Sequence, residues 1–135
     1  MYIKLGLFIG GKWIYEAKKG EDVLNPFDES VLGWLPHATE DNLNDAVKSA
    51  EKGFDEWRNT DPETRGRIIL KAADILSKRI SAVSEVMTLE QGKPLAESAG
   101  EINQSIAILK FNGTNAKLIK DDLVADRENG LKTLI

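Results

Sequence analysis

The 135-residue sequence contains no cysteine and a single histidine, His37. The missing cysteines exclude disulfide bonds, thiolate ligands for metals and cysteine nucleophiles from this stretch of polypeptide. One histidine cannot form a histidine cluster around a metal ion. His37 itself falls between a predicted strand and a predicted helix, where we expect a loop residue without a special role. The sequence therefore predicts no metal site.

The sequence also lacks any apolar run near the roughly 20 residues that a membrane-spanning helix needs. Its apolar first segment, residues 1–10, is short and has neither a basic region nor a small-residue cleavage site of the secretory kind. Eighteen basic and 22 acidic residues give a net charge of −4, which offers no electrostatic footprint for nucleic acid or an anionic membrane. We expect a cytoplasmic globular protein with no nucleic-acid partner and no membrane partner.

Two β-hairpins are predicted at the start of the chain. The segment LFIGGKWIY, residues 7–15, has two β-rich runs on either side of a Gly-Gly pair at 10–11, which tolerates the positive φ angles of a tight turn. In DVLNPFDESVLGWLPH, residues 22–37, two further runs flank residues 25–28, whose residue types favour a turn. The strands expected there are 23–24 and 31–35.

The hydrophobic period becomes helical after Thr39, which is a suitable N-cap. This helix should end near Arg58-Asn59. Gly53 inside it costs ~1 kcal/mol relative to alanine, so we expect it to pack closely against a neighbouring element. The apolar positions of this helix, spaced by threes and fours, are Leu43, Ala46 or Val47, Ala50, Phe54 and Trp57.

A second helix is predicted to begin at Asp61-Pro62, because aspartate is a good N-cap and proline suits the first helical position. The pattern continues to Gly92 as C-cap, a length that favours a kink or break near 79–81. The expected inward stripe is Ile69, Ala72, Ala73, Leu76, Ile80, Val83 and Met87.

A third helix should open at Pro94 and end at Gly113. Residues 117–135 then indicate a short helical turn or loop, followed by a strand at 131–135. No repeat or linker marks an internal boundary. The positions of the third helix expected to face inward are Leu95, Ala99, Ile102, Ile106 and Leu109.

The segment MTLEQGKPLAESAGEI, residues 87–102, contains the residues that most resemble a functional site. Its Gly92-Lys93 pair fails as a phosphate-binding loop, because that motif needs glycine five residues earlier and Ser or Thr after the lysine. This sequence has Met87 and Pro94 at those positions. No GxGxxG fingerprint for a dinucleotide occurs in the sequence either.

The acidic residues of this segment favour a solvated surface over acid–base catalysis. Lys93, Glu97 and Glu101 follow one another at four-residue spacing, which predicts an ion-pair ladder worth a few tenths of a kcal/mol per pair. A catalytic carboxylate needs a partner and a cleft, and the sequence identifies neither. We therefore assign no catalytic, cofactor-binding or metal-binding residue. A similar ladder is expected on the preceding helix at Arg67, Lys71, Asp74 and Lys78.

Several ordered segments resemble the N-terminal portion of the NAD(P)-dependent aldehyde dehydrogenases. FIGGKWI resembles the family's first hairpin, and NPFDESVLGWLP resembles its second. AVKSAEKGFDEWRNTDPETRGRIILKAADIL resembles the first two helices of the family. MTLEQGKPLAESAGEI is the most similar segment and resembles the succinate-semialdehyde dehydrogenase branch in particular. The resemblance extends over nearly the whole chain.

The resemblance implies an α/β family fold, of which this chain holds N-terminal β-hairpins, three main helices and the start of a strand. Residues 1–135 would form a single partial domain, the N-terminal part of the cofactor-binding domain. Residues 131–135 would begin the strand that leads to the oligomerisation arm. Family members are oxidoreductases that convert an aldehyde, here including succinate semialdehyde, to the acid with NAD or NADP. A homo-oligomer is implied as well.

The family reaction uses a cysteine thiolate, a glutamate-activated water and an asparagine amide. This sequence has no cysteine that could be the nucleophile. We therefore expect an N-terminal fragment that is inactive alone and binds no NAD(P) by itself. The alternative is a helical interaction module that self-associates or docks onto a complementary dehydrogenase fragment, because helices shaped to cover a sheet expose apolar stripes without it.

Overall fold

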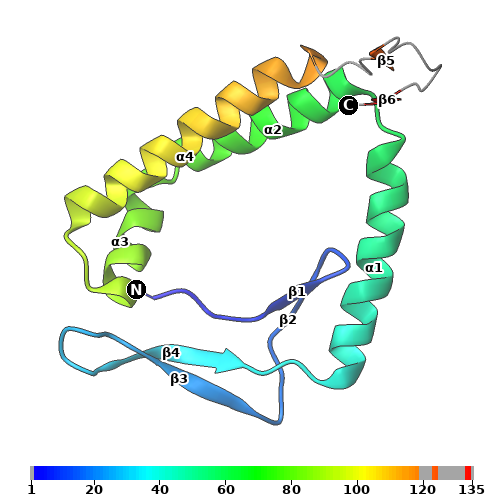
Figure 1. The fold of residues 1–135 in the computed structure, drawn as a ribbon. Coiled ribbons are helices and arrows are strands. Elements are labelled where there is room, and N and C mark those ends of the chain that lie inside the picture. The colour runs from blue at the N-terminus through cyan, green and yellow to red at the C-terminus, as the bar shows by residue number, and fades with distance from the viewer. Residues whose placement is uncertain (1, 119–122, 125–132, 135) are drawn as a thin grey trace.

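The computed structural model describes residues 2–118, 123–124 and 133–134. Among the described residues, two hairpins, four α-helices and a 3₁₀ turn follow one another around an open ring (Figure 1), and two further short strands pair with each other. The elements in chain order are β1 (Leu7–Ile9), β2 (Lys12–Ile14), β3 (Gly20–Leu24), β4 (Val31–Pro36), α1 (Glu40–Arg58), α2 (Pro62–Ser77), α3 (Ile80–Gln91), α4 (Leu95–Asn115), η1 (Ala116–Leu118), β5 (Leu123–Val124) and β6 (Thr133–Leu134).

Both predicted hairpins are present. β1 and β2 pair antiparallel, and Gly10 and Gly11 form the turn between them with φ angles of 56° and 78°. β3 and β4 pair antiparallel across the predicted turn at 25–28, with Gly20 opposite Pro36 at the open end. A two-stranded hairpin is marginally stable by itself in water. The positions of these hairpins therefore depend on their contacts with other parts of the chain.

The first helix is capped as predicted. The Thr39 hydroxyl accepts a hydrogen bond from the Asn42 backbone N–H, and the Asn42 side chain accepts one from the Thr39 N–H. This reciprocal capping box satisfies two backbone donors that the first turn would otherwise leave free. The helix ends at Arg58 with Asn59 as its C-cap, as expected.

The apolar stripe of α1 has no core to cover it within the described residues, as expected of helices that lack the sheet they would cover. No residue of α1 is buried, and the helix contacts chiefly β1. Its large apolar side chains are between 41% and 62% exposed. We call these four residues the α1 stripe, and they are Leu43, Val47, Phe54 and Trp57.

The close approach expected at Gly53 occurs instead between α2 and α4. Nothing lies within 4 Å of a Cβ built at Gly53. A Cβ at Gly66 would stand 2.5 Å from the carbonyl oxygen of Gly113, and one at Gly113 would stand 2.8 Å from Cγ of Leu70. The two glycines thus let the helix backbones touch. Gly113 lies inside α4, which continues to Asn115, so the helix end predicted there is wrong.

The predicted break in the long second helical segment is confirmed. α2 ends at Ser77 and α3 begins at Ile80, with the N–H of Lys78 donating to the Leu76 carbonyl. α3 ends where predicted, because Gly92 takes a left-handed φ of 70° that glycine adopts at little cost. The sequence therefore yields four α-helices where three main helices were expected.

The buried core of the described residues lies between α2, α3 and α4, and α2 and α4 run side by side in Figure 1. Ala73, Ile102 and Ile106 are buried, which confirms the centre of both predicted stripes. Leu95 is 51% exposed, because it opens α4 and the first buried residue of that helix is Ser98. Partly buried side chains packed against the core are Leu76, Ile80, Val83, Met87 and Leu109.

The last described elements, β5 and β6, pair antiparallel. The strand predicted at 131–135 includes β6, and its other residues lie outside the described ones. Its assignment to an oligomerisation arm, and that of 1–135 to the cofactor-binding domain, stay predictions. None of the helices in the described part of the chain combines the length and hydropathy of a membrane span.

Ile106→Ala should lower the free energy of unfolding by about 2–5 kcal/mol, because it leaves a cavity in the core beside α2. Leu43→Ala is the matched control on the exposed α1 stripe, and it should change the free energy of unfolding by less than about 0.5 kcal/mol. Urea unfolding followed by circular dichroism measures both variants. Equal losses would show that the α1 stripe is buried in solution.

Gly53→Ala should raise the free energy of unfolding by about 0.5–1 kcal/mol, because the glycine is helical and its surroundings are open. Gly113→Ala should lower it, since the added methyl group would overlap Leu70. Thermal unfolding of both variants tests this pair. A destabilising Gly53→Ala would indicate that another element packs against α1.

Candidate functional site

The segment with the most site-like sequence forms the corner between α3 and α4. The N–H of Gly92 donates to the Thr88 carbonyl, and Pro94 holds an extended backbone immediately before α4. Pro26, in the turn between β3 and β4, lies against this corner, because a Cβ at Gly92 would stand 3.0 Å from its Cγ. The corner is therefore a junction of three parts of the chain.

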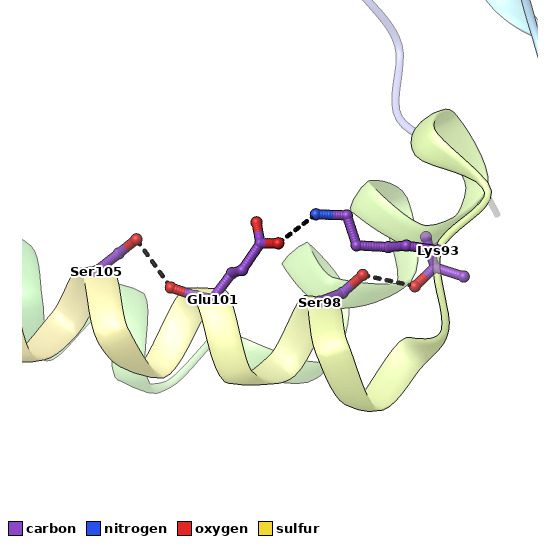
Figure 2. A network of polar contacts seen from close by, with 5 residues as sticks. Lys93, Ser98, Glu101 and Ser105 are labelled. Atoms are coloured by element: carbon purple, nitrogen blue, oxygen red, sulfur yellow. Dashed lines mark hydrogen bonds and ion pairs between the residues drawn. The ribbon is translucent and has the colours of Figure 1, made fainter.

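Lys93 links the corner to the second turn of α4. Its Nζ donates to Oε1 of Glu101 at 2.6 Å (Figure 2). The Lys93 side chain is only 17% exposed, whereas that of Glu101 is 55% exposed. The predicted ladder through Glu97 is wrong, because Lys93 precedes Pro94 and lies outside the helix where four-residue spacing would apply. This ion pair closes the corner and gives the Glu101 carboxylate a partner.

Buried hydroxyl groups line the contact between α3 and α4. The Thr88 and Ser98 hydroxyls lie 2.8 Å apart. Figure 2 shows Ser98 on α4 with its dashed contact. Ser84 donates to the Ile80 carbonyl at 2.7 Å. Ser84 and Ser98 are 1% and 0% exposed. A nucleophilic serine needs an adjacent general base and access to substrate. Ser84 and Ser98 are buried, so neither has access to a substrate. Ser84 bonds to a main-chain carbonyl of its own helix, and the Thr88–Ser98 hydrogen bond stabilises the contact between α3 and α4.

The N-terminal arm reaches α3 next to the same corner. The Tyr2 hydroxyl donates to the Glu90 carboxylate. The Tyr2 ring covers Gly33 of β4, where a Cβ would stand 2.8 Å from it. Burial, followed by the hydrogen bond to Glu90 and its negative charge, raises the pKa of Tyr2 to about 12. Tyr2 therefore acts as a hydrogen-bond donor at neutral pH and not as a base.

Sequence reasoning missed the Tyr2–Glu90 contact. The two residues are 88 positions apart, and neither belongs to a periodic pattern or a recognised motif. A hydrogen bond at such a separation leaves no local signal. Glu90 accordingly has a partner, although the glutamates of this segment were expected only to face water.

His37 occupies the loop between β4 and α1, where the sequence placed it. The imidazole Nε2 of His37 lies 3.7 Å from Oε1 of Glu21. The backbone N–H of His37 donates to the Lys19 carbonyl. Both side chains of the pair are largely exposed. Within the described ranges no hydroxyl group hydrogen-bonds to this histidine.

An open hollow of about 350 Å³ lies where the start of α2 meets the end of α4. Its charged side chains are exposed and of both signs, which gives it no preference for one ligand charge. Arg67 donates to the Thr64 hydroxyl. Arg67 also belongs to the ion-pair ladder predicted on α2, and the part of the chain that the structure describes shows no ion pair of that ladder. The lining residues are Glu63, Arg67, Leu70, Gly113, Thr114 and Lys117.

Metal ligands do not converge in the described residues, where no group of three or more His, Asp or Glu side chains could hold an ion. The two carboxyl groups with lowered pKa values are exposed turn and cap residues. Hydrogen bonds from Ser30 lower the pKa of Asp28, and those from Thr64 lower the pKa of Asp61. The assignment of no catalytic, cofactor-binding or metal-binding residue stays a prediction.

Exposed apolar side chains are the feature that most strongly suggests a function. Beside the α1 stripe, the first hairpin exposes Phe8 and Trp13, with ring centroids 5.0 Å apart, and Trp13 stacks on Tyr15. Contiguous apolar surface of this kind marks interaction sites in soluble proteins. The paired helices α2 and α4 also expose Ile68, Ile75, Ile108 and Phe111.

Comparisons with known proteins agree on one family. The model of the family described as "Aldehyde dehydrogenase family" matches residues 13–134. An aldehyde dehydrogenase of Davidiella tassiana is 34% identical over 111 residues, which are 80% of this chain and 22% of that protein. The malonate-semialdehyde dehydrogenase 2 of Geobacillus kaustophilus is 30% identical over 128 residues, which are 93% of this chain and 26% of that protein.

A solved structure supports the fold. A point mutant of betaine aldehyde dehydrogenase from Staphylococcus aureus, in complex with NAD+, superposes with a TM-score of 0.84 at 21% identity. The match covers 97% of this chain and 27% of that one. The chain therefore has the fold predicted from its sequence, and it spans about a quarter of the length of the relatives it matches.

The Tyr2 phenol should titrate near pH 12, above its usual pKa of 10.0, because the folded chain favours the protonated form. The protonated Tyr2 phenol then makes its full contribution to the free energy of unfolding below pH 10.0. This contribution is lost as the pH rises through about 12. Ultraviolet absorbance of tyrosinate measures the titration, and Tyr2→Phe identifies the phenol responsible. Tyr15→Phe is the control. A Tyr2 phenol that ionises at its usual pKa would contradict the contact with Glu90.

Proposed function

Because this chain belongs to the aldehyde dehydrogenase family, we propose that it forms the N-terminal part of an NAD(P)-dependent oxidoreductase that converts an aldehyde to the acid. The family match over nearly all of the chain supports this proposal. Since the chain spans about a quarter of its relatives, the activity, the substrate and the assembly of a whole enzyme belong to the proposal. A cytoplasmic location and a homo-oligomer are proposed with it.

A semialdehyde is the substrate class that we propose. The segment at 87–102 resembles the succinate-semialdehyde dehydrogenase branch, and the Geobacillus relative is named for malonate semialdehyde. Both compounds carry a carboxylate beside the reacting aldehyde. The substrates to test first are therefore succinate semialdehyde and malonate semialdehyde.

NAD or NADP would be held by parts of the enzyme other than this chain. The described strands form three separate antiparallel pairs. Dinucleotides in open α/β folds bind at the carboxyl ends of parallel strands, beside a glycine-rich turn. The residues described here do not fit such a group. A cysteine nucleophile would also have to come from elsewhere, because this sequence has none.

The observation that carries the proposal is the exposure of the α1 stripe. Complete burial of a fully exposed large apolar side chain contributes about 1.5–3 kcal/mol to the free energy of association. The side chains of the α1 stripe are already partly covered, so each would contribute less than that. The α1 helix is also close to residues of the first hairpin, whose aromatic side chains are exposed. We propose that the remainder of a dehydrogenase, covalently attached or separate, covers these surfaces.

Self-association is the second candidate function, and the spacing of the α1 stripe favours it. Residues 43, 47, 50, 54 and 57 alternate steps of four and three, as the core positions of a coiled coil do. Two copies of α1 could cover each other's stripes in this way. Light scattering at increasing protein concentration tests this candidate, and a compact monomer throughout would contradict it.

Co-expression with a complementary dehydrogenase polypeptide should yield a complex that reduces NAD or NADP when a semialdehyde is added. The DNA downstream of the Ile135 codon identifies which polypeptide to use. Phe54→Asp should lower complex yield and activity at least about tenfold, because a buried charge costs more than the roughly 1.4 kcal/mol that a tenfold change requires. Lys52→Asp, on an exposed position of the same helix, is the matched control.

The chain alone is the second control and should reduce neither cofactor above background. Turnover by the chain alone would overturn the proposal, because the nucleophile would then lie within it. A complex that forms without activity would contradict the proposed reaction while supporting the docking surface.

A further inference from the structure

The described residues divide into two units that are joined at few points. The hairpin unit, residues 2–58, holds the first two hairpins and α1, and the helix unit, residues 62–118, holds α2 to η1. The extensive contacts lie within each unit: β3 with β4 and α1 with β1 in one, α4 with α2 and α3 in the other. The chain passes between the units once, at 59–61.

The hydrogen bond from Tyr2 to Glu90 joins these units on the far side of the ring. It is the one such bond between them among the residues that the structure describes. Figure 1 shows the N-terminus next to α3, whereas the link from α1 to α2 lies across the ring from it. Pro26 meets Gly92 on the same side as Tyr2 and Glu90, through van der Waals contact alone.

The link at 59–61 has the local features of a hinge. Asn59 and Thr60 bond back to carbonyl groups of α1, and the Asp61 side chain caps α2. Each of these bonds belongs to one helix end, so a rotation between Thr60 and Asp61 breaks none of them. Hinges are commonly a few residues at element ends that absorb changes in φ and ψ.

We propose that Tyr2 and Glu90 form a strap that holds the two units together, and that its release lets the hairpin unit swing about residues 59–61. Tyr2 is suited to this role because its ring stays on Gly33 of the hairpin unit while its hydroxyl reaches the helix unit. While the hydrogen bond between Tyr2 and Glu90 is formed, the α1 stripe keeps a fixed position relative to the exposed side chains of α2 and α4. This inference concerns the conformation of the chain itself and does not depend on the proposed reaction.

The absence of cysteine permits a direct test, because two introduced cysteines are the only sites that a thiol-specific spin label can modify. Asp22→Cys in β3 and Gln104→Cys in α4 place exposed labels on the two units. Pulsed electron paramagnetic resonance should give one narrow distance distribution. Adding Tyr2→Phe should increase the population at other distances about three- to tenfold, since it removes the donor and keeps the ring.

Glu90→Ala should have the same effect, whereas Glu90→Gln keeps an acceptor oxygen and should retain the narrow distribution. Glu97→Ala is the matched control, because it removes an exposed carboxylate from the neighbouring helix. Circular dichroism checks that the variants fold, and neither Tyr2 nor Glu90 belongs to the buried core. The proposal is overturned if Tyr2→Phe and Glu90→Ala leave the distribution unchanged, if Glu97→Ala broadens it equally, or if the starting chain is already as broad.

Discussion

The backbone contact between α2 and α4 is the constraint on which the other packing depends. Gly66 and Gly113 bring the two helices close enough for Ala73 to meet Ile102 and Ile106. α3 then adds side chains to the same core, and its turn into α4 is fixed by hydroxyl groups and the Lys93 ion pair. Any side chain at either glycine would separate the helices and open this core. The hairpins and α1 contribute no residue to it.

Local chemistry explains how much of the fold could be predicted. Thr39, Asp61 and Gly92 each stabilise a helix end through atoms only a few residues away, so the helix boundaries follow from short sequence patterns. The Gly-Gly turn of the first hairpin follows from the same kind of information. Periodicity identified the apolar face of α1, and exposed helical stripes were expected under the alternative of an interaction module, but periodicity says nothing of which surface covers such a face.

In the candidate site, too, contacts between residues close in sequence could be predicted better than contacts between distant ones. Periodicity placed Lys93 in a ladder with Glu97, but a side chain before a helix follows the path of the connecting loop and reaches Glu101 instead. Tyr2 and Glu90 meet only once the ring has formed. Residues 87–102 nevertheless point to the family that the comparisons show. The glycine, proline, lysine and hydroxyl residues of this segment each have a defined place in one corner.

The caps of α1 have a consequence for how its exposed stripe would meet a partner. Thr39 and Asn42 stabilise one end, and Asn59 and Thr60 return hydrogen bonds to the other. In this structure the helix is complete although its stripe is exposed, so a backbone already in this state has little conformational entropy left to lose on association. Binding energy gained along the stripe would go into affinity instead of into ordering the segment. A preorganised helix of this kind can dock as a rigid ridge, without a coupled folding step.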